Sequence, residues 1–479
     1  MKRLNISIIS VSLMMLFASC SDWLTVEPQA VTSKDKMFTS ELGFSSALVG
    51  LYLELQNVYS PTNFMMGGST EYMANNYLTT TSETSDSYLF HTHRYTSTTI
   101  DASLGALFLS YYKIIANCNI LIDALQGQSV VEPDEAAIIE GEALAIRAYC
   151  HFELLRLWGP PPTKIDASRK YLPYVTTVET SPYEYITYDA FVQKVKEEFN
   201  KAITLMEPVD PITAYSNGTL NASYATISKY QAMFWYNRQK RFNVYGVKAL
   251  LARLYLWTGD KDNAYKEAKS IVDVKNPDGN PKFTLGTQSD ITNSDFLFYS
   301  EHLVGLGLTE WLDKQGAFSG RFSAYVNSYA NINSMLYDNQ TDMRMNLFTS
   351  SYSYSFGTSV YGTRKYSKFT STDYNSPKSI PLIRLSELYL ILIETAPLEE
   401  ANQYYKTFRS SRSASYTALT EPTRVREVEK EYVREFFSEG GQSFFMYKRL
   451  NAASLLLSSE GMSADKYELP IPTDETGEF

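Results

Sequence analysis

Residues 247–272 read VKALLARLYLWTGDKDNAYKEAKSIV and contain two apolar stripes on either side of a glycine. The residues of the first stripe recur every three or four positions, as on one face of a helix: Val247, Leu250, Leu251, Leu254 and Trp257. After Gly259, Asp260 can cap a second helix, whose stripe is Ala264, Ala268 and Val272. The small residues allow the two helices to approach closely. The stretch therefore predicts an antiparallel helix pair of tetratricopeptide type, a unit that stacks with its neighbours.

Three further segments carry helical patterns. Residues 140–158 have a stripe of Leu144, Ala148, Phe152 and Leu155, and Gly159 with the prolines at 160–162 predicts its end. A second helix is predicted over Leu382–Ala396, where Arg384 and Glu387 are spaced to pair across one turn. A third is predicted over Val425–Ser438, where acidic and basic residues alternate as on a salt-bridged helix face, and Gly440 and Gly441 stop it.

The segments between these helices are polar and aromatic with weak helical signals. They are predicted as long loops and short β hairpins and cover Ser60–Ser103, Asn217–Asn221, Asn276–Ser323 and Ser350–Phe369. The predicted fold class is therefore mostly α: a tetratricopeptide-like superhelix with irregular connections.

The N-terminus carries a secretory pattern. Lys2 and Arg3 precede an uncharged run from Ile6 to Phe17, and Ala18-Ser19-Cys20 follows. The run is shorter than the ~20 residues of a membrane span. A cysteine after two small residues is typical of a bacterial lipobox, so residues 1–19 are predicted to be a signal peptide and Cys20 the lipidated residue. The alternative is plain secretion with an incidental cysteine.

Removal of residues 1–19 would leave 460 of the 479 residues, and the loss of Lys2 and Arg3 would change the formal net charge from −10 to −12. An acidic chain is not expected to bind nucleic acid or anionic lipid. No segment after the signal peptide is expected to span a membrane, so membrane attachment is predicted to rest on the lipid alone.

Cys118 and Cys150 are predicted to lie on helices among apolar neighbours. An exported protein permits a disulfide between them, and the apolar surroundings suit two buried free thiols equally well. The sequence leaves both states open.

Taken together, these segments resemble the SusD/RagB family of outer-membrane nutrient-binding, starch-binding-protein-like lipoproteins. The matching residues are the lipobox, Asp22-Trp23-Leu24, Gly50-Leu51-Tyr52, and the segments 142–149, 248–256, 380–390, 439–449 and 469–472. The most specific match is IPLIRLSELYL at residues 380–390. Departures at residues 408–409 and 442–447 bear on subgroup and ligand.

The resemblance implies about four tetratricopeptide-like helix pairs in residues 20–479. It divides this region into an N-terminal SusD-like part over about 20–235 and a C-terminal RagB/SusD part over about 236–479, intertwined as one unit. It also implies a lipoprotein of the outer membrane, facing the cell exterior, that delivers an oligomeric nutrient to a SusC-like TonB-dependent barrel. The first ligand expected is a glycan and the second a peptide. A lipid-anchored tetratricopeptide scaffold that binds only protein partners is the alternative.

The chain has 37 tyrosines, and aromatic residues make up 14% of it, which suits the binding of extended ligands on flat, rigid side chains. Tyrosines at helical spacing are expected to pack in the core. The candidate ligand contacts are therefore the aromatic residues of the polar segments: Trp311, Tyr72, Tyr77, Tyr95, Tyr299 and Tyr361.

The sequence carries none of the common catalytic motifs, such as a phosphate-binding loop, a His-Glu-x-x-His pair or a nucleophile elbow, so the protein is not predicted to be an enzyme. His91 and His93 could approach a metal ion from one strand face. They have no cysteine or acidic partner at a ligand spacing, so a solvated loop or a glycan contact is expected instead. No cofactor and no metal ion are predicted.

Overall fold

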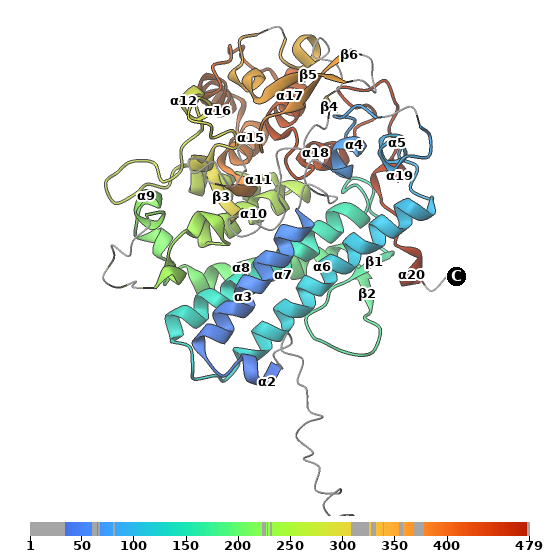
Figure 1. The fold of residues 1–479 in the computed structure, drawn as a ribbon. Helices are drawn as coiled ribbons and strands as arrows, with labels where there is room; N and C mark the ends of the chain where they lie inside the picture. The colour runs from blue at the N-terminus through green and yellow to red at the C-terminus, as the bar shows by residue number, and fades with distance from the viewer. Residues whose placement is uncertain are drawn as a thin grey trace, which may run out of the picture.

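The computed structural model describes residues 34–59, 65, 68–79, 82–222, 227, 229, 232–307, 325–326, 332–338, 340–353, 358–367 and 378–476. In this part of the chain the fold is mostly helical with a few short strands, as predicted, and its helices pack as tetratricopeptide-like repeats. Figure 1 shows long N-terminal helices side by side on one side of the molecule and shorter C-terminal helices on the other.

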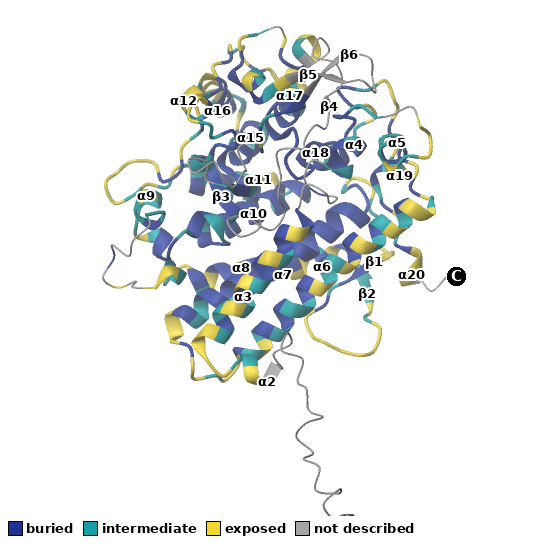
Figure 2. Ribbon diagram, in the orientation of Figure 1, coloured by how far each residue is buried: buried dark blue, intermediate teal, exposed yellow. Residues whose placement is uncertain are grey.

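The N-terminal layer consists of α3 (Glu41–Val58), α6 (Thr98–Ala124), α7 (Pro133–Trp158) and α8 (Tyr188–Met206). α6 packs against α3 and α7, and α7 packs against α8. The helix predicted over residues 140–158 is confirmed as the second part of α7 and ends before Gly159, as predicted. It begins earlier, with Pro133 in its first turn, where a proline costs no hydrogen bond. Figure 2 shows α7 buried along most of its length, so it is the central helix of this layer.

α6 corrects the expectation that no later segment approaches a membrane span. By length and composition α6 could cross a membrane, since its 27 residues include a strongly apolar stretch. The sequence analysis missed this because part of α6 falls within the segment predicted as loop. In the structure α6 packs against α3 and α7, and 44% of its apolar stretch is buried. Packing within this layer thus accounts for part of the apolar stretch.

The predicted helix pair is confirmed as α10 (Val244–Trp257) and α11 (Lys261–Val272), which pack against each other. Gly259 turns the chain with a φ of +81°, a conformation that favours glycine. The Asp260 carboxylate then accepts a hydrogen bond of 3.2 Å from the backbone N–H of Asn263 and caps α11, as predicted.

The repeat stack continues with α15 (Leu385–Thr395), α16 (Leu398–Ser411), α17 (Glu421–Phe436) and α18 (Gln442–Leu450). α15 packs against α11, α16 and α17, and α17 packs against α18. Gly440 and Gly441 both have positive φ between α17 and α18, so the stop predicted there is confirmed.

The start of the helix predicted over residues 382–396 is wrong. Residues 379–384 form strand β7 (Ser379–Arg384), which pairs antiparallel with β3 (His302–Gly307), and the helix begins only at Leu385. A short apolar run fits a buried strand as well as a helix, and periodicity does not separate the two. β3 lies within the segment predicted as loops and short β hairpins, and Gly305 and Gly307 are part of it.

The remaining described elements are short and connect the long helices. The polar segments are predicted as loops and short β hairpins, and this prediction is wrong at residues 69–73, 86–91, 217–220 and 288–292, which form short helices. The helices are α2 (Lys34–Met37), α4 (Ser69–Met73), α5 (Asp86–His91), α9 (Asn217–Leu220), α12 (Gln288–Thr292), α19 (Ala464–Tyr467) and α20 (Thr473–Thr476). The single-turn helices are η2 (Pro211–Thr213), η3 (Met233–Trp235), η4 (Arg238–Lys240), η5 (Tyr299–Glu301), η7 (Ile332–Leu336) and η8 (Met343–Leu347). The strands β1 (Lys170–Pro173) and β2 (Tyr185–Thr187) pair with each other, and β6 (Thr358–Thr363) pairs with both β4 (Tyr325–Val326) and β5 (Phe348–Ser353).

Cys118 of α6 and Cys150 of α7 are free and fully buried. Burial raises the pKa of both thiols, so both are neutral packing residues at physiological pH. Of the two states that the sequence left open, the structure shows the free thiols.

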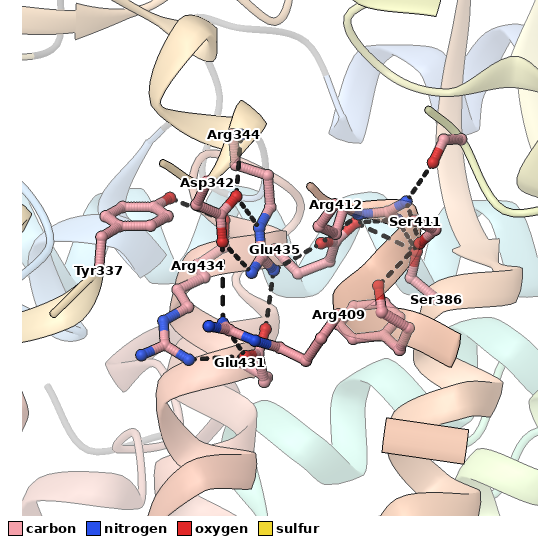
Figure 3. A network of polar contacts seen from close by, with 12 residues as sticks. Tyr337, Asp342, Arg344, Ser386, Arg409, Ser411, Arg412, Glu431, Arg434 and Glu435 are labelled. Carbon is pink, nitrogen blue, oxygen red and sulfur yellow. Dashed lines mark hydrogen bonds and ion pairs between the residues drawn. The ribbon is translucent and has the colours of Figure 1, made fainter. Parts of the chain in front are cut away.

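A buried network of charged side chains holds the C-terminal half together (Figure 3). Its centre is Glu435 of α17, whose carboxylate contacts Arg384 at 2.6 Å, Arg412 at 2.7 Å and Arg344 at 2.9 Å. One turn earlier, Glu431 contacts Arg344, Arg409 and Arg434 at 2.6–2.8 Å. These seven side chains are each at most 3% exposed. The salt-bridged character predicted for this helix is confirmed, but this part of it is buried.

The same network corrects the predicted pairing of Arg384 with Glu387. Arg384 is the last residue of β7, and its guanidinium contacts Glu301, Glu435 and Glu439. Glu387 instead pairs with Arg253 of α10 at 2.6 Å. Arg384 thus ties the strand to α17, while Glu387 ties α15 to α10.

Candidate functional site

A pocket of about 350 Å³ opens between α3, α6 and the two short helices between them, α4 and α5. This α4–α6 pocket is lined by Asn57 of α3, Tyr72 of α4, Asp86 and Phe90 of α5, and Lys113 of α6. Its volume falls within the ~300–1,000 Å³ range of small-ligand sites. The pocket therefore lies where the segment that connects α3 to α6 passes over these two helices.

A chain of aromatic contacts holds the Tyr72 ring in place. Tyr72 is half-buried, and its ring meets the buried Tyr77 ring edge-on, with 5.5 Å between the ring centroids. The Tyr77 ring in turn meets Phe437, and the Tyr77 and Ser438 hydroxyls share a hydrogen bond of 2.6 Å. The ring thus rests on the segment that follows α17, and a ring fixed in this way can bind a ligand at low entropic cost.

The rest of the pocket offers both hydrogen-bond donors and acceptors. Lys113 pairs with Glu54 at 3.0 Å, and the side-chain amide of Asn117 also donates to this carboxylate. The pocket is further lined by four hydroxyls, those of Ser69, Ser87, Ser103 and Ser110. Flat aromatic faces together with hydroxyl, amide and carboxylate groups suit a ligand with many hydroxyls.

Among the described residues, no group of three or more His, Cys, Asp and Glu side chains is arranged to hold a metal ion. The pocket offers binding contacts, and its described lining includes no histidine or cysteine.

Comparison with known proteins relates this chain to a family. The SusD-like family model described as "Starch-binding associating with outer membrane" matches residues 22–231. SusD-like protein P25 of Formosa agariphila is 26% identical over 166 residues, which cover 34% of this chain and 31% of the relative. The chain is SusD-like over residues 22–231. The match to the curated relative spans less than a third of that protein's length.

Solved structures of the SusD superfamily share the fold over most of the chain. A SusD superfamily protein from Bacteroides thetaiotaomicron has a TM-score of 0.67 at 21% identity and covers 91% of this chain and 97% of its own. Surface glycan-binding protein A from the same organism, in complex with laminarihexaose, has a TM-score of 0.59 at 15% identity and covers 92% and 98%. At these identities the likeness concerns the fold.

Of the aromatic residues predicted as ligand contacts, Tyr72 lines the α4–α6 pocket of this SusD-like protein. Tyr77 is 1% exposed and belongs to the core, so it supports Tyr72 and offers no ring face to a ligand. Tyr95 is 6% exposed, and its hydroxyl donates to the Lys466 carbonyl. Burial thus contradicts a direct contact of Tyr77 with a ligand. The contact predicted for Tyr95 stays a prediction, because Tyr95 is largely buried but lines a second pocket, outside the α4–α6 pocket.

The other predicted contacts lie away from this pocket or outside the described residues. Tyr299 of η5 is half-buried, and its hydroxyl donates to the Asn221 side chain. Tyr361 lies in β6, where its backbone pairs with Ser350 of β5. Trp311 and Cys20 lie outside the described residues. Among the predicted contacts whose side chains the structure describes, Tyr72 lines the α4–α6 pocket and Tyr77, Tyr95 and Tyr299 do not.

His91 and His93 do not share a strand face. His91 ends α5, and His93 follows in a turn with a φ of +55°. The His93 Nε2 atom hydrogen-bonds to the Met73 carbonyl at 2.9 Å, and burial lowers the pKa of His93 to about 4. His93 is therefore a neutral, buried residue and does not lie in the solvated loop that was expected.

The sequence analysis missed the pocket residues contributed by helices. These residues are Asn57 of α3, Asp86 and Phe90 of α5, and Lys113 of α6. Their spacing in the sequence indicates which face of each helix they occupy, but not that they line a common pocket. Asn57 and Lys113 are exposed polar residues of their helices, so they do not stand out in the sequence. No local signal indicates that these residues face α5.

Proposed function

We propose that this SusD-like protein binds an oligosaccharide in the α4–α6 pocket and delivers it, as a lipid-anchored protein facing the cell exterior, to a SusC-like TonB-dependent barrel. The supporting observation is the Tyr72 ring, held by Tyr77 beside hydroxyl, amide and charged groups. Aromatic side chains beside such groups are suited to the faces and hydroxyls of sugar rings. Two further findings support a glycan: the family is described as starch-binding, and a relative in the fold comparison was solved with laminarihexaose.

The test is calorimetry of the chain without its first 19 residues against a panel of neutral, carboxylated and sulfated glycans and of peptides. Tyr72→Ala is expected to weaken binding of the recognised ligand about fivefold or more, because one stacking ring contributes about 1 kcal/mol. Tyr72→Phe keeps the ring face and is the matched control, expected to retain most of the affinity.

The melting temperature of each variant separates binding from folding. Because Tyr72 is only half-buried, its replacement is expected to leave the fold intact. Unchanged affinity of Tyr72→Ala would remove this pocket from the site. Binding of peptides alone would favour a peptide importer of the same class, and binding of neither ligand class would favour a protein scaffold.

The lipid anchor is tested at Cys20. Cys20→Ala is expected to release the protein from the outer membrane or to leave the precursor unprocessed, because the thiol that accepts the diacylglycerol is absent. The wild type is expected to incorporate labelled palmitate, and Cys118→Ala to behave as the wild type. Equal membrane retention of Cys20→Ala, with no label in the wild type, would contradict the anchor.

The transporter partner and the surface orientation are tested on whole cells. Protease added to intact cells should degrade the anchored protein. Affinity purification from detergent-solubilised outer membranes should recover a large TonB-dependent barrel. A protein that is protected from the protease, or that is recovered without a barrel, would contradict the delivery role while leaving glycan binding intact.

A further inference from the structure

A second pocket, of about 630 Å³, lies beside the turn that follows α5. It is formed by the turn after this helix, residues 93–96, by the C-terminal segment from Asp465 to Ile471, and by Arg169. This C-terminal pocket shares no lining residue with the α4–α6 pocket. All of its lining residues lie in the described part of the chain.

The most informative lining residue is His93, which is 8% exposed. Because the Met73 carbonyl can only accept a hydrogen bond, the Nε2 atom of His93 donates to it, and the other ring nitrogen of the neutral imidazole is an acceptor. This Nδ1 atom is buried and has no hydrogen-bond partner among the described residues. A buried acceptor without a partner is costly, and a ligand that donates a hydroxyl hydrogen would satisfy it.

The walls of the C-terminal pocket are held in fixed positions. The Tyr95 hydroxyl donates to the Lys466 carbonyl at 3.0 Å, and the Tyr95 ring meets the His93 ring edge-on. The indole N–H of the buried Trp158 donates to the Pro470 carbonyl at 2.9 Å. These bonds fix the apolar side formed by Leu469, Pro470 and Ile471, so the pocket presents a preformed surface to a ligand.

The charges around this pocket balance. Arg169 pairs with Glu468 at 2.7 Å, while Arg94 donates to the Glu83 carbonyl and lies over the Tyr88 ring. Together with Asp465, the lining carries two guanidinium and two carboxylate groups. With two groups of each sign, the lining offers no net attraction to a sulfated, carboxylated or cationic ligand. The balance favours a neutral ligand with many hydroxyls.

We propose that the C-terminal pocket is a second subsite for a neutral oligosaccharide, with a sugar hydroxyl donating to His93 and the ring face lying over Pro470 and Ile471. This inference rests on the proposed function. The two pockets are linked through the hydrogen bond from His93 to the carbonyl of Met73, which is the neighbour of Tyr72. On this proposal the recognised ligand is an oligomer with one part in each pocket.

The experiment titrates oligosaccharides of two to eight residues, in neutral, carboxylated and sulfated series, into the chain without its first 19 residues. Ile471→Trp fills the C-terminal pocket from its half-buried rim. It is expected to weaken binding of the longest neutral oligomer about tenfold, the loss typical of one well-packed contact region, and to leave the shortest bound oligomer unaffected. Tyr72→Ala is expected to weaken binding of both lengths.

Two further variants keep the test independent of folding. Asp465→Ala removes an exposed carboxylate that lines the pocket, and it is expected to reduce only the affinity for long oligomers. Val178→Ser, at an exposed position outside both pockets, is the matched control, expected to bind as the wild type.

If neither Ile471→Trp nor Asp465→Ala changes the dependence of affinity on chain length, the second subsite is wrong while the proposed function stands. Preference for sulfated or carboxylated oligomers overturns the neutral ligand class. Failure of every glycan to bind the wild type overturns the proposed function and this inference together.

Discussion

Glu435→Gln is expected to lower the free energy of unfolding by about 3–5 kcal/mol, the usual cost of removing one partner from a buried ion pair. The Glu435 carboxylate lies among Arg344, Arg384 and Arg412, and all four side chains are at most 1% exposed. A glutamine of the same shape would remove a counter-charge that three guanidiniums share, although each of them keeps at least one other carboxylate partner. The N–H groups of the glutamine amide would also face the N–H groups of the arginines, where no hydrogen bond can form.

The measurement is urea unfolding at pH 7, with the midpoints of wild type and variant compared. Glu429→Gln is the matched control on the same helix, because Glu429 pairs with the exposed Arg426 at 3.1 Å. An exposed pair contributes about 0–1 kcal/mol, so the control midpoint should barely move. Equal losses in the two variants would show that the network contributes no more than a surface pair.

Glu71→Gln is expected to stabilise the protein at pH 8 by up to about 3 kcal/mol, which is the free-energy equivalent of the difference between a pKa of 4.5 and one of about 7. Burial raises the pKa of Glu71 to about 7, against the opposing effects of the Asn76 side chain, the Ser438 backbone N–H and Lys365. Glu439, nearby, raises it further. One carboxylate oxygen, Oε1, is buried without a hydrogen-bond partner among the described residues.

The sign of the pH dependence follows from the proton on the Glu71 carboxyl, which the folded state retains to a higher pH than the unfolded state. Below pH 4.5 Glu71 is protonated in both states, and its contribution to stability is fully present. Between pH 4.5 and about 7 the unfolded chain loses this proton first, so the contribution is lost as the pH rises through the folded-state pKa. Glutamine mimics the protonated side chain and should remove this loss.

Melting temperatures of wild type and Glu71→Gln across pH 5 to 8 provide the test. The two curves should nearly coincide at pH 5 and separate as the pH rises. Glu83→Gln changes an exposed carboxylate in the same region and should follow the wild type at every pH. A constant difference between wild type and Glu71→Gln would contradict a buried carboxyl that titrates near pH 7.

The parts of the fold that could be predicted from the sequence are those determined by local pattern. The apolar stripes and the Gly259-Asp260 turn predicted α10 and α11. Helical spacing and capping depend only on residues within about one helical turn of each other, so they can be recognised in the sequence. The position of Arg384 could not be predicted in the same way. Its spacing from Glu387 fits a helix, whereas its partners Glu435 and Glu301 lie 51 and 83 residues away.

The site was harder to predict than the fold. Tyr72 and Tyr77 are both aromatic residues in a polar segment, and the sequence treats them alike. The structure separates them: Tyr72 lines a pocket, while Tyr77 is buried against Phe437. This separation depends on how α4 packs between the two layers, which is a long-range property without a local signal.

The buried charge network also constrains the order of events during synthesis. Its arginines and carboxylates lie between Glu301 and Glu439, so nascent chains that end before this region contain none of its pairs. The N-terminal helices α6, α7 and α8 contact near neighbours in sequence and can form early. The arginines of the C-terminal half lack their partners Glu431 and Glu435 until α17 has emerged, so the network can be completed only after that helix is made.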